Sequence, residues 1–193
     1  GCQNNSTQKF PQGIEHVIVI GVDGLSPDGI RNAETPVIDS MINNGAVKWN
    51  VRTVLTTASS QNWASMIMGA GPEQHGVIDN DWEREEHSLP PVVAGEEGIF
   101  PTIFGLIRSQ KPDAEIGTVY HWGGFGRLCE KKAVNYDKHF STEDSTAADF
   151  TTYIKEKKPT FGFVHFDHVD HAGHHDGHGT PAYYAAVSKT DSL

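Results

Sequence analysis

The most constraining feature of the sequence is the run HVIVIGVDG over residues 16–24. It is continuously apolar, rich in β-branched residues, and ends in Gly and Asp, which is typical of a strand buried in a parallel sheet. A second such run, TFGFVHFD, covers residues 160–167. Strands of this kind are covered by helices on both faces of their sheet, so the rest of the chain is expected to supply those helices.

Strand-like and helix-like segments alternate along the chain. Further strands are predicted over residues 47–55 and 115–122. Helices are predicted over residues 35–46, 59–71, 97–110, 141–158 and 180–193. The alternation implies right-handed crossovers and an α/β fold, with a mostly parallel sheet and helices on both faces. We expect one domain over residues 15–193, because no repeat or linker divides it, preceded by a flexible polar tether over residues 1–14.

Composition narrows the class of protein. The 193 residues are 37% hydrophobic and 21% charged, which is typical of a globular domain with a sizeable core. The net charge of −10 argues against nucleic acid polymers or an anionic membrane surface as general partners. The net charge does not exclude an anionic substrate, because bound metal ions can make the local electrostatic potential positive.

The two cysteines, Cys2 and Cys129, form neither a disulfide framework nor a CxxC metal site. The opening GCQNNSTQKFPQG resembles the start of a mature bacterial lipoprotein, with a cysteine at the processed end and a flexible leash after it. On that interpretation an acyl anchor on Cys2 holds the domain in the periplasm or cell envelope. The alternative is an incidental cysteine at an arbitrary chain start.

Polar side chains follow the predicted strands at their carboxyl ends, where open α/β sheets bind ligands. Asp23 follows the first strand, a hydroxyl- and amide-rich stretch from Thr56 to Asn62 follows the second, and Asp170 and His174 follow the strand that starts at Thr160. We therefore expect these side chains to meet at one site.

Each of these residues also has a simpler interpretation. Asp23 lies in the turn-like DGLSPDG, so it is either a metal ligand or a turn aspartate. Ser59 is either a nucleophile or a helix N-cap, and as a nucleophile it needs a metal ion to lower its pKa, since no GxSxG elbow surrounds it. Asp170-x-x-x-His174 suits zinc, but the segment is also consistent with a loosely metal-binding surface tract, or with a histidine acting as a plain general base.

Taken together, the motifs resemble the alkaline phosphatase superfamily, and most closely its type I phosphodiesterase / nucleotide pyrophosphatase branch. VIVIGVDGL resembles the first strand with its metal-binding Asp, here Asp23, and TPVIDSMINNGA resembles the TPNLDxLxxxG helix. TTASSQNWASMIMGAGPEQHGV resembles the nucleophile segment PTxTxPNxxSLxTGxxPExHGI, which places the nucleophile at Ser59 and the phosphoryl-binding asparagine at Asn62. VHFDHVDHAGH resembles xYxxxPDxxGH, with metal ligands at Asp170 and His174.

The resemblance implies a three-layer sandwich and hydrolysis of phosphate esters through a phosphoryl-serine intermediate. It implies two Zn²⁺ ions, one contacting Asp23 and Ser59 and the other held by Asp170 and His174, although Mn²⁺ and other divalent ions also suit such ligands. The implied substrate is a small phosphate ester such as a nucleotide, cleaved at a phosphodiester or pyrophosphate bond. His168, His171, His175 and His178 remain candidates for supporting or substrate contacts, without a specific role.

The chain also departs from the family pattern. Ser replaces the usual Thr nucleophile, Gln61 replaces a Pro, and Trp63 replaces a frequent His. The family completes its metal sites with a later Asp-His pair and a further His, so the chain is expected to be the N-terminal part of a longer catalytic domain. A phosphomonoesterase, a non-catalytic fragment and a simple histidine-rich metal scavenger therefore remain alternatives, while a sulfatase is disfavoured because Ser59 lies outside a C/S-x-P-x-R setting.

Overall fold

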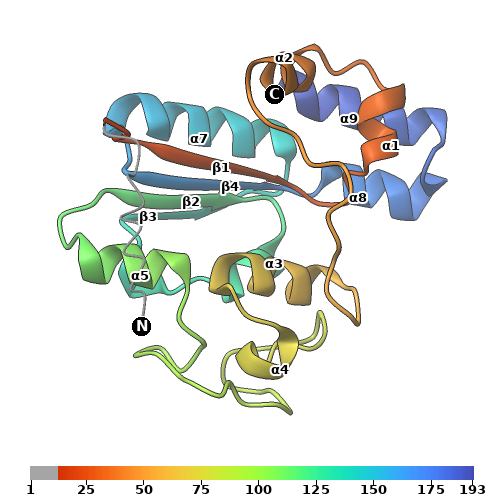
Figure 1. Cartoon of the computed structure of the whole chain (residues 1–193). Helices are drawn as coiled ribbons and strands as arrows, with labels where there is room; N and C mark the ends of the chain where they lie inside the picture. The colour runs from red at the N-terminus through yellow and green to blue at the C-terminus, as the bar shows by residue number, and fades with distance from the viewer. Residues whose placement is uncertain (1–12) are drawn as a thin grey trace, which may run out of the picture.

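Four parallel strands form the centre of the fold in the computed structural model, which describes residues 13–193 (Figure 1). The strands are β1 (Val17–Val22), β2 (Ile116–Tyr120), β3 (Tyr136–His139) and β4 (Phe161–Phe166), in the spatial order β1-β4-β2-β3. Val22 of β1 lies in register with Phe166 of β4. The residues that follow these two strands, Asp23 and Asp167, therefore leave the sheet side by side.

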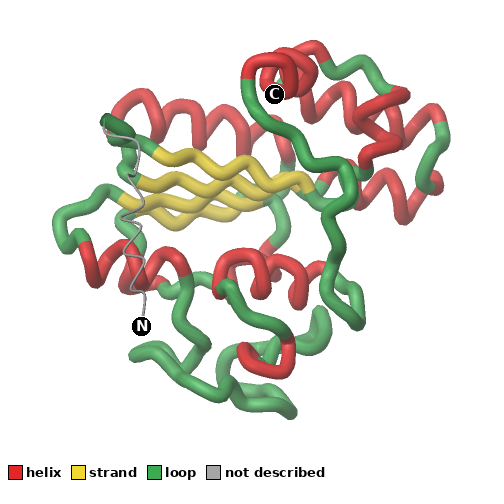
Figure 2. The backbone as a smooth tube through the Cα atoms, in the orientation of Figure 1, coloured by secondary structure: helices red, strands yellow, loops and turns green. Residues whose placement is uncertain are grey.

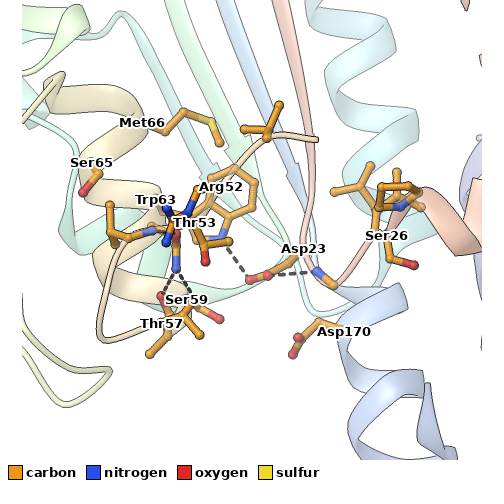
Figure 3. Close-up of a pocket in the computed structure, with 18 of the residues that line it drawn as sticks. Asp23, Ser26, Arg52, Thr53, Thr57, Ser59, Trp63, Ser65, Met66 and Asp170 are labelled. Carbon is orange, nitrogen blue, oxygen red and sulfur yellow. Dashed lines mark hydrogen bonds between the residues drawn. The ribbon is translucent and has the colours of Figure 1, made fainter. Parts of the chain in front are cut away.

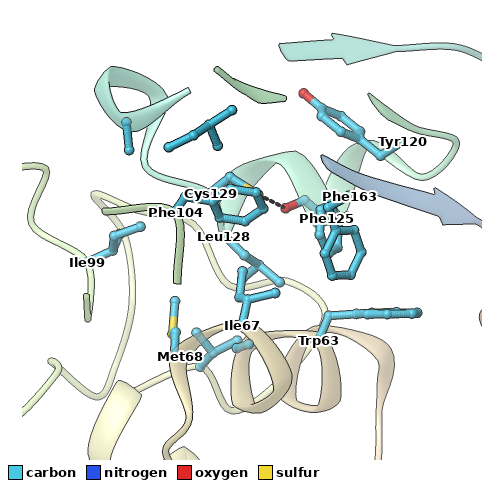
Figure 4. Close-up of a cluster of buried hydrophobic side chains, with 14 of the residues drawn as sticks. Trp63, Ile67, Met68, Ile99, Phe104, Tyr120, Phe125, Leu128, Cys129 and Phe163 are labelled. Atoms are coloured by element: carbon cyan, nitrogen blue, oxygen red, sulfur yellow. Dashed lines mark hydrogen bonds between the residues drawn. The ribbon is translucent and has the colours of Figure 1, made fainter. Parts of the chain in front are cut away.

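Helices cover both faces of this sheet, which confirms the predicted three-layer α/β architecture (Figure 1). Helix α7 (Glu143–Lys157) lies on one face, while α3 (Ser59–Met68) and α5 (Ile103–Gln110) lie on the other. The main core between the sheet and α3/α5 contains Trp63, Ile67, Phe104, Phe125 and Phe163, all buried (Figure 4). Burial of these large side chains anchors α3 to the sheet.

A second group of helices gathers beyond the carboxyl ends of the strands (Figure 1). It comprises α1 (Pro27–Asn32), α2 (Pro36–Asn44), α8 (His168–Ala172), the π-helical turn η2 (Gly173–Gly177) and α9 (Pro181–Ser192). The Asp191 carboxylate of α9 accepts hydrogen bonds from the backbone N–H groups of Val37 and Ile38 at 3.1 and 2.7 Å. These bonds satisfy the open first turn of α2, where the Thr35 side chain makes no capping bond.

The remaining short elements are α4 (Pro72–His75), α6 (Gly123–Arg127) and the 3₁₀ turn η1 (Lys131–Ala133). Long irregular segments join α2 to α3 and α4 to α5 (Figure 2). No helix within residues 13–193 is both long and apolar enough to cross a bilayer. The predicted tether over residues 1–14, with Cys2, falls almost entirely outside the described residues.

Three sequence predictions about the elements need correction. Residues 47–55 do not form a strand but lie within an irregular loop over residues 46–58, with Val51 and Leu55 more than three-quarters exposed. Their alternating pattern lacks a neighbouring strand to pair with, and without a hydrogen-bonded partner alternation alone does not make a strand. The helix predicted over 97–110 begins only at Ile103, because Thr102 caps it by accepting from the backbone N–H groups of Phe104 and Gly105.

The third correction concerns the burial of β1. This strand forms as predicted, but it lies at the edge of the four-stranded sheet and, within the described chain, pairs with β4 alone. Val17 is 47% exposed and Ile20 54% exposed, whereas every residue of β4 is buried. A continuous apolar run indicates a strand suited to burial, but its place in the sheet depends on its partners.

Candidate active site

Asp23 is held at the carboxyl end of β1 by two hydrogen bonds (Figure 3). The indole Nε1–H of Trp63 donates to its Oδ2 at 2.9 Å, and the backbone N–H of Gly24 donates to its Oδ1 at 3.0 Å. Burial by itself raises the pKa of Asp23, but the nearby His165 ring, the hydrogen bond from Trp63 and the Ser59 hydroxyl outweigh it and leave the pKa lowered. The Asp23 carboxylate is therefore stabilised in its charged form.

Two glycines allow the close approach of the elements around Asp23. A Cβ atom on Gly21 would lie 2.6 Å from the Trp63 ring, so only glycine leaves room for the indole against β1. A Cβ atom on Gly24 would lie 2.5 Å from the Cα of Asp170, and Gly24 also has a positive φ of +71°. Gly24 thus lets the β1–α1 loop touch α8 at the residue that carries the second candidate carboxylate.

Asp170 and His174 are brought together by α8 and the following π-helical turn. The Nε2 atom of His174 lies 3.5 Å from Oδ2 of Asp170, and the His174 side chain is 83% exposed. Burial, followed by the negative charge of Asp23, raises the pKa of Asp170, while His174 partly offsets this. The pair thus lies at an open edge of the site. A nearby positive charge would stabilise the ionised form of the Asp170 carboxylate.

Ser59 is the first residue of α3, and Ala58 is the N-cap. The interpretation of Ser59 as a capping serine is therefore wrong, because the helix begins one residue earlier than a Ser59 cap requires. Within α3, the backbone N–H of Ser60 is taken by the side-chain carbonyl of Asn80 at 2.9 Å. The Ser59 hydroxyl instead interacts with the Asp23 carboxylate and helps to lower its pKa.

Asn62 organises the loop before α3. Its Oδ1 accepts the backbone N–H of Val54 at 3.1 Å, and its Nδ2 donates to the Thr57 hydroxyl and the Ala58 carbonyl, both at 2.9 Å. Both amide hydrogens are thus engaged within the protein. A contact from Asn62 to a phosphoryl oxygen requires one of these two bonds to be exchanged.

The five residues predicted for the site line one cavity of about 1030 Å³. Its walls come from the β1–α1 loop, the 47–54 segment, the start of α3, and α8 with η2. Asp23, Ser59, Asn62, Asp170 and His174 all contribute, and so do the cationic side chains of Lys48 and Arg52. In Figure 3, Ser59 and Asp170 lie on either side of Asp23. The motifs, which are far apart in the sequence, therefore meet at one cavity.

His165 and Asp167 belong to this site as well, and sequence reasoning gave them no role. Within residues 13–193, Asp23, His165 and Asp167 form one group whose potential ligand atoms all lie within 4.8 Å of one another. His165 is completely buried, neither ring nitrogen has a hydrogen-bond partner in the described chain, and its Nε2 lies 3.8 Å from Oδ2 of Asp23. The available signal was a histidine at the carboxyl end of an otherwise apolar buried strand.

The site gathers more negative charge than its own side chains neutralise. Burial raises the pKa of Asp167 and outweighs the opposing charge of His165, and repulsion from Asp23 adds a smaller rise. Burial and then repulsion from Asp23 raise the pKa of Asp170. Half-buried carboxylates and a buried, unpartnered imidazole are the donor set that divalent metal ions bind with mixed N/O coordination. These residues fit a divalent cation, because its charge would relieve both the repulsion and the unmet hydrogen-bonding capacity of His165.

Comparison with known proteins finds a family match over part of the chain. A sequence model of the family "Type I phosphodiesterase / nucleotide pyrophosphatase" matches residues 17–102, the segment that carries Asp23, Ser59 and Asn62. The chain is related to this family. Curated relatives include bovine bis(5'-adenosyl)-triphosphatase ENPP4, 22% identical over 185 residues, and mouse ectonucleotide pyrophosphatase/phosphodiesterase family member 1, 22% identical over 206 residues. These alignments cover 92% and 100% of this chain but 40% and 23% of the relatives.

Solved structures share the fold over nearly the whole chain. An inactive variant of murine ectonucleotide pyrophosphatase/phosphodiesterase 5, in complex with AMP, superposes with a TM-score of 0.73 at 20% identity. The match covers 92% of this chain and 50% of that one. Phosphonoacetate hydrolase from Sinorhizobium meliloti, in complex with phosphonoacetate, matches with a TM-score of 0.64 at 16% identity, over 93% of this chain and 52% of that one. The chain thus spans about half the length of these structural relatives.

Proposed function

We propose that the cavity lined by Asp23, Ser59, Asp170 and His174 is the active site of a metal-dependent phosphoesterase that cleaves phosphodiester or nucleotide pyrophosphate bonds. The observation that carries the proposal is the convergence of a serine hydroxyl, two carboxylates and an imidazole from three separate segments on one cavity. Relatives named as nucleotide pyrophosphatases and phosphodiesterases support the choice of reaction. The proposed substrate is therefore a small phosphate ester such as a nucleotide.

In the proposed reaction Ser59 is the nucleophile. Its Oγ forms a bond to phosphorus as the bond from phosphorus to the leaving oxygen breaks, and the hydroxyl proton ends on that leaving group or on solvent. Water then cleaves the Oγ–P bond of the phosphoryl-serine and restores the hydroxyl. Trp63 and Gly24 keep the Asp23 carboxylate fixed through both steps, because each donates a hydrogen bond to a different oxygen.

Asp23, Ser59, Asp170 and His174 are the proposed ligands of two Zn²⁺ ions, and His165 and Asp167 extend the donor set on the buried side. Bound there, divalent ions would supply Lewis acidity that lowers the pKa of the Ser59 hydroxyl and offsets charge on the phosphate. Lys48 and Arg52 add positive charge at the cavity wall, which favours entry of an anionic ester into an acidic protein.

The test is hydrolysis of bis(4-nitrophenyl) phosphate by the complete gene product that contains this chain. Ser59→Ala is expected to lower turnover at least about a thousandfold, since it removes the atom that forms the covalent intermediate. Ser60→Ala is the matched control, because it makes the same change one residue further along α3, and it is expected to retain turnover. Turnover by Ser59→Ala near the wild-type value would overturn the assignment of Ser59, and faster cleavage of 4-nitrophenyl phosphate than of the diester would favour a phosphomonoesterase.

We further propose a cell-envelope location through an acyl chain on Cys2, a residue outside the described part of the chain. Support comes from the sequence around Cys2 alone. Metabolic labelling with a fatty-acid analogue tests it in bacterial cells that express the complete gene. Labelling that is lost in Cys2→Ser is the expected result, and an unlabelled wild-type protein would contradict the proposal.

A further inference from the structure

Three of the histidines that the active site does not use lie on a different side of the same helical segment, while Nε2 of the fourth, His178, lies 2.9 Å from the Ser26 hydroxyl. Helix α8 runs directly into the π-helical turn η2, since Ala172 and Gly173 both keep helical backbone angles. His174 therefore faces the first cavity, whereas His168, His171 and His175 line a second cavity of about 370 Å³. His174 and His175 are adjacent in the sequence, but they line two separate cavities.

The second cavity has an imidazole rim and an apolar wall. The rings of His171 and His175 are nearly parallel, at an angle of 17°, with their centroids 6.1 Å apart. The rest of the lining consists of the small side chains of Ala172, Ala182, Ala185 and Ala186. Alanines cannot ligate or compete for a bound group, so the imidazoles and Asp176 carry all the chemistry of this cavity.

Carboxylates lie beside the Nδ1 atoms of two of these histidines. Nδ1 of His175 lies 2.9 Å from Oδ1 of Asp176, and Nδ1 of His168 lies 3.6 Å from Oε1 of Glu143. Within residues 13–193 the Nε2 atoms of both rings make no hydrogen bond. A carboxylate on one ring nitrogen and a free second nitrogen is the arrangement in which histidine binds transition metals, because the carboxylate fixes the tautomer and raises ligand basicity.

We propose that His168, His171 and His175 form a second metal site, which takes one imidazole-preferring divalent cation such as Ni²⁺, Cu²⁺ or Zn²⁺. Zinc binds imidazole nitrogen at about 2.0–2.1 Å, so two rings that share an ion bring their nitrogens to roughly 3–4 Å. The His171 and His175 side chains are exposed and their ring centroids lie 6.1 Å apart, so binding of a shared ion requires the two rings to turn toward each other. The neighbouring Asp176 and Glu143 disfavour an anion here, since both add negative charge at the rim.

The site is independent of the proposed catalysis, and its test does not use activity. Tag-free protein is titrated with Ni²⁺ by isothermal calorimetry, comparing wild type, a His171→Ala/His175→Ala variant and a His174→Ala variant. The double variant is expected to lose one bound ion per chain, or at least tenfold in affinity for it, while His174→Ala retains that ion. All three substituted side chains are exposed, so circular dichroism is expected to show the same fold.

A second readout identifies the ligands. The electron paramagnetic resonance spectrum of one bound Cu²⁺ is expected to show coupling to imidazole nitrogens that disappears in the double variant. Asp176→Asn is expected to weaken binding about tenfold, because it removes the partner that orients His175. Wild-type Ni²⁺ stoichiometry and affinity in the double variant would overturn the proposal, and so would loss of this ion in His174→Ala alone.

Discussion

The indole N–H of Trp63 donates a 2.9 Å hydrogen bond to Oδ2 of Asp23, so the helix that presents Ser59 also fixes the carboxylate at the end of β1. The two residues are 40 positions apart in the sequence. Trp63 is also part of the main core, with edge-on contacts to Phe125 and Phe163 at ring-centroid distances of 5.7 and 6.1 Å. Core packing and the geometry of the site are therefore coupled through one side chain.

Trp63→Phe is expected to lower the free energy of unfolding and to weaken binding of divalent metal at Asp23. The substitution removes a hydrogen bond to a charged group, which contributes about 1.5–3 kcal/mol, in addition to the lost ring volume. Urea denaturation and zinc titration measure the two effects. Trp82→Phe is the matched control, because Trp82 is equally buried at 5% exposure and its Nε1 has no partner in the described chain. Equal losses in both variants would contradict a role for the Trp63 hydrogen bond.

Gly24→Ala is expected to destabilise the protein more than Gly98→Ala does. Both glycines have a positive φ, +71° and +76°, and the backbone cost of that conformation is about 1–2 kcal/mol for other residues. Only Gly24 also meets a neighbour, with its added Cβ 2.5 Å from the Cα of Asp170, whereas nothing lies within 4 Å at Gly98. Thermal melts of the two variants separate the clash from the backbone strain, and similar Tm values would show that the loop does not need to touch α8.

Asn62→Ala is expected to loosen the loop over residues 54–58 and to lower the free energy of unfolding by about 1–3 kcal/mol. Three hydrogen bonds from one side chain are lost, which leaves the Val54 N–H and the Ala58 carbonyl without that partner. Limited proteolysis is expected to cut within this loop faster than in the wild type. Asn44→Ala serves as the control, since the Asn44 amide donates only to Ser40 of its own helix. An unchanged cleavage rate in Asn62→Ala would contradict the organising role of Asn62.

Stability is expected to fall as pH decreases from about 6.5 towards 4 because of His75. Burial lowers the pKa of His75 from 6.5 to about 4, although the charge of Glu73 acts in the opposite direction. Both nitrogens of the neutral His75 ring have partners: Nδ1 accepts a hydrogen bond from the Val77 N–H at 3.0 Å, and Nε2 lies 2.9 Å from the Ser65 hydroxyl. Between pH 4 and 6.5 the unfolded chain binds a proton that the folded chain excludes, so the stability present above pH 6.5 is lost progressively.

The size of this effect follows from the change in pKa. A difference of about 2.5 units corresponds to at most about 3 kcal/mol lost near pH 4. Urea unfolding at pH 7, 6 and 5 measures the slope, and His75→Gln is the comparison, because glutamine has similar reach but does not titrate. A slope that is the same in His75→Gln would show that other groups cause the pH dependence.

Local sequence patterns predicted the elements that carry the site and the order in which they meet. Apolar runs located β1 and β4, and Thr-Pro pairs located the starts of α2 and α9, because these signals depend on a few neighbouring residues. The carboxyl-end rule then placed Asp23, Asp170 and His174 around one cavity, whereas Ser59 and Asn62 reach that cavity after an irregular loop and not after the predicted strand over 47–55. The short strand β3, with half of its residues exposed, was missed because YDKH has no apolar run.

Relationships between distant segments were beyond the reach of these patterns. The false strand over 47–55 alternates correctly, but only the fold shows that no strand lies beside it. The hydrogen bond from Trp63 and the burial of His165 under Asp23 depend on the packing of α3 against β1 and β4. The division of the histidine-rich segment between two cavities depends on the π-helical turn over Gly173–Gly177. No sequence pattern predicted that turn.

The most direct test of the central claim is zinc content per chain, measured by elemental mass spectrometry in the His171→Ala/His175→Ala background, where the proposed second site cannot contribute. Zinc retained in that background, and lost when Asp23→Asn and Asp170→Asn are added, is the predicted result. It would mean that the cavity at the carboxyl ends of β1 and β4 is a metal centre. Zinc content that is unchanged by Asp23→Asn and Asp170→Asn would contradict the account, because no other pair of carboxylates was assigned to hold the proposed ions.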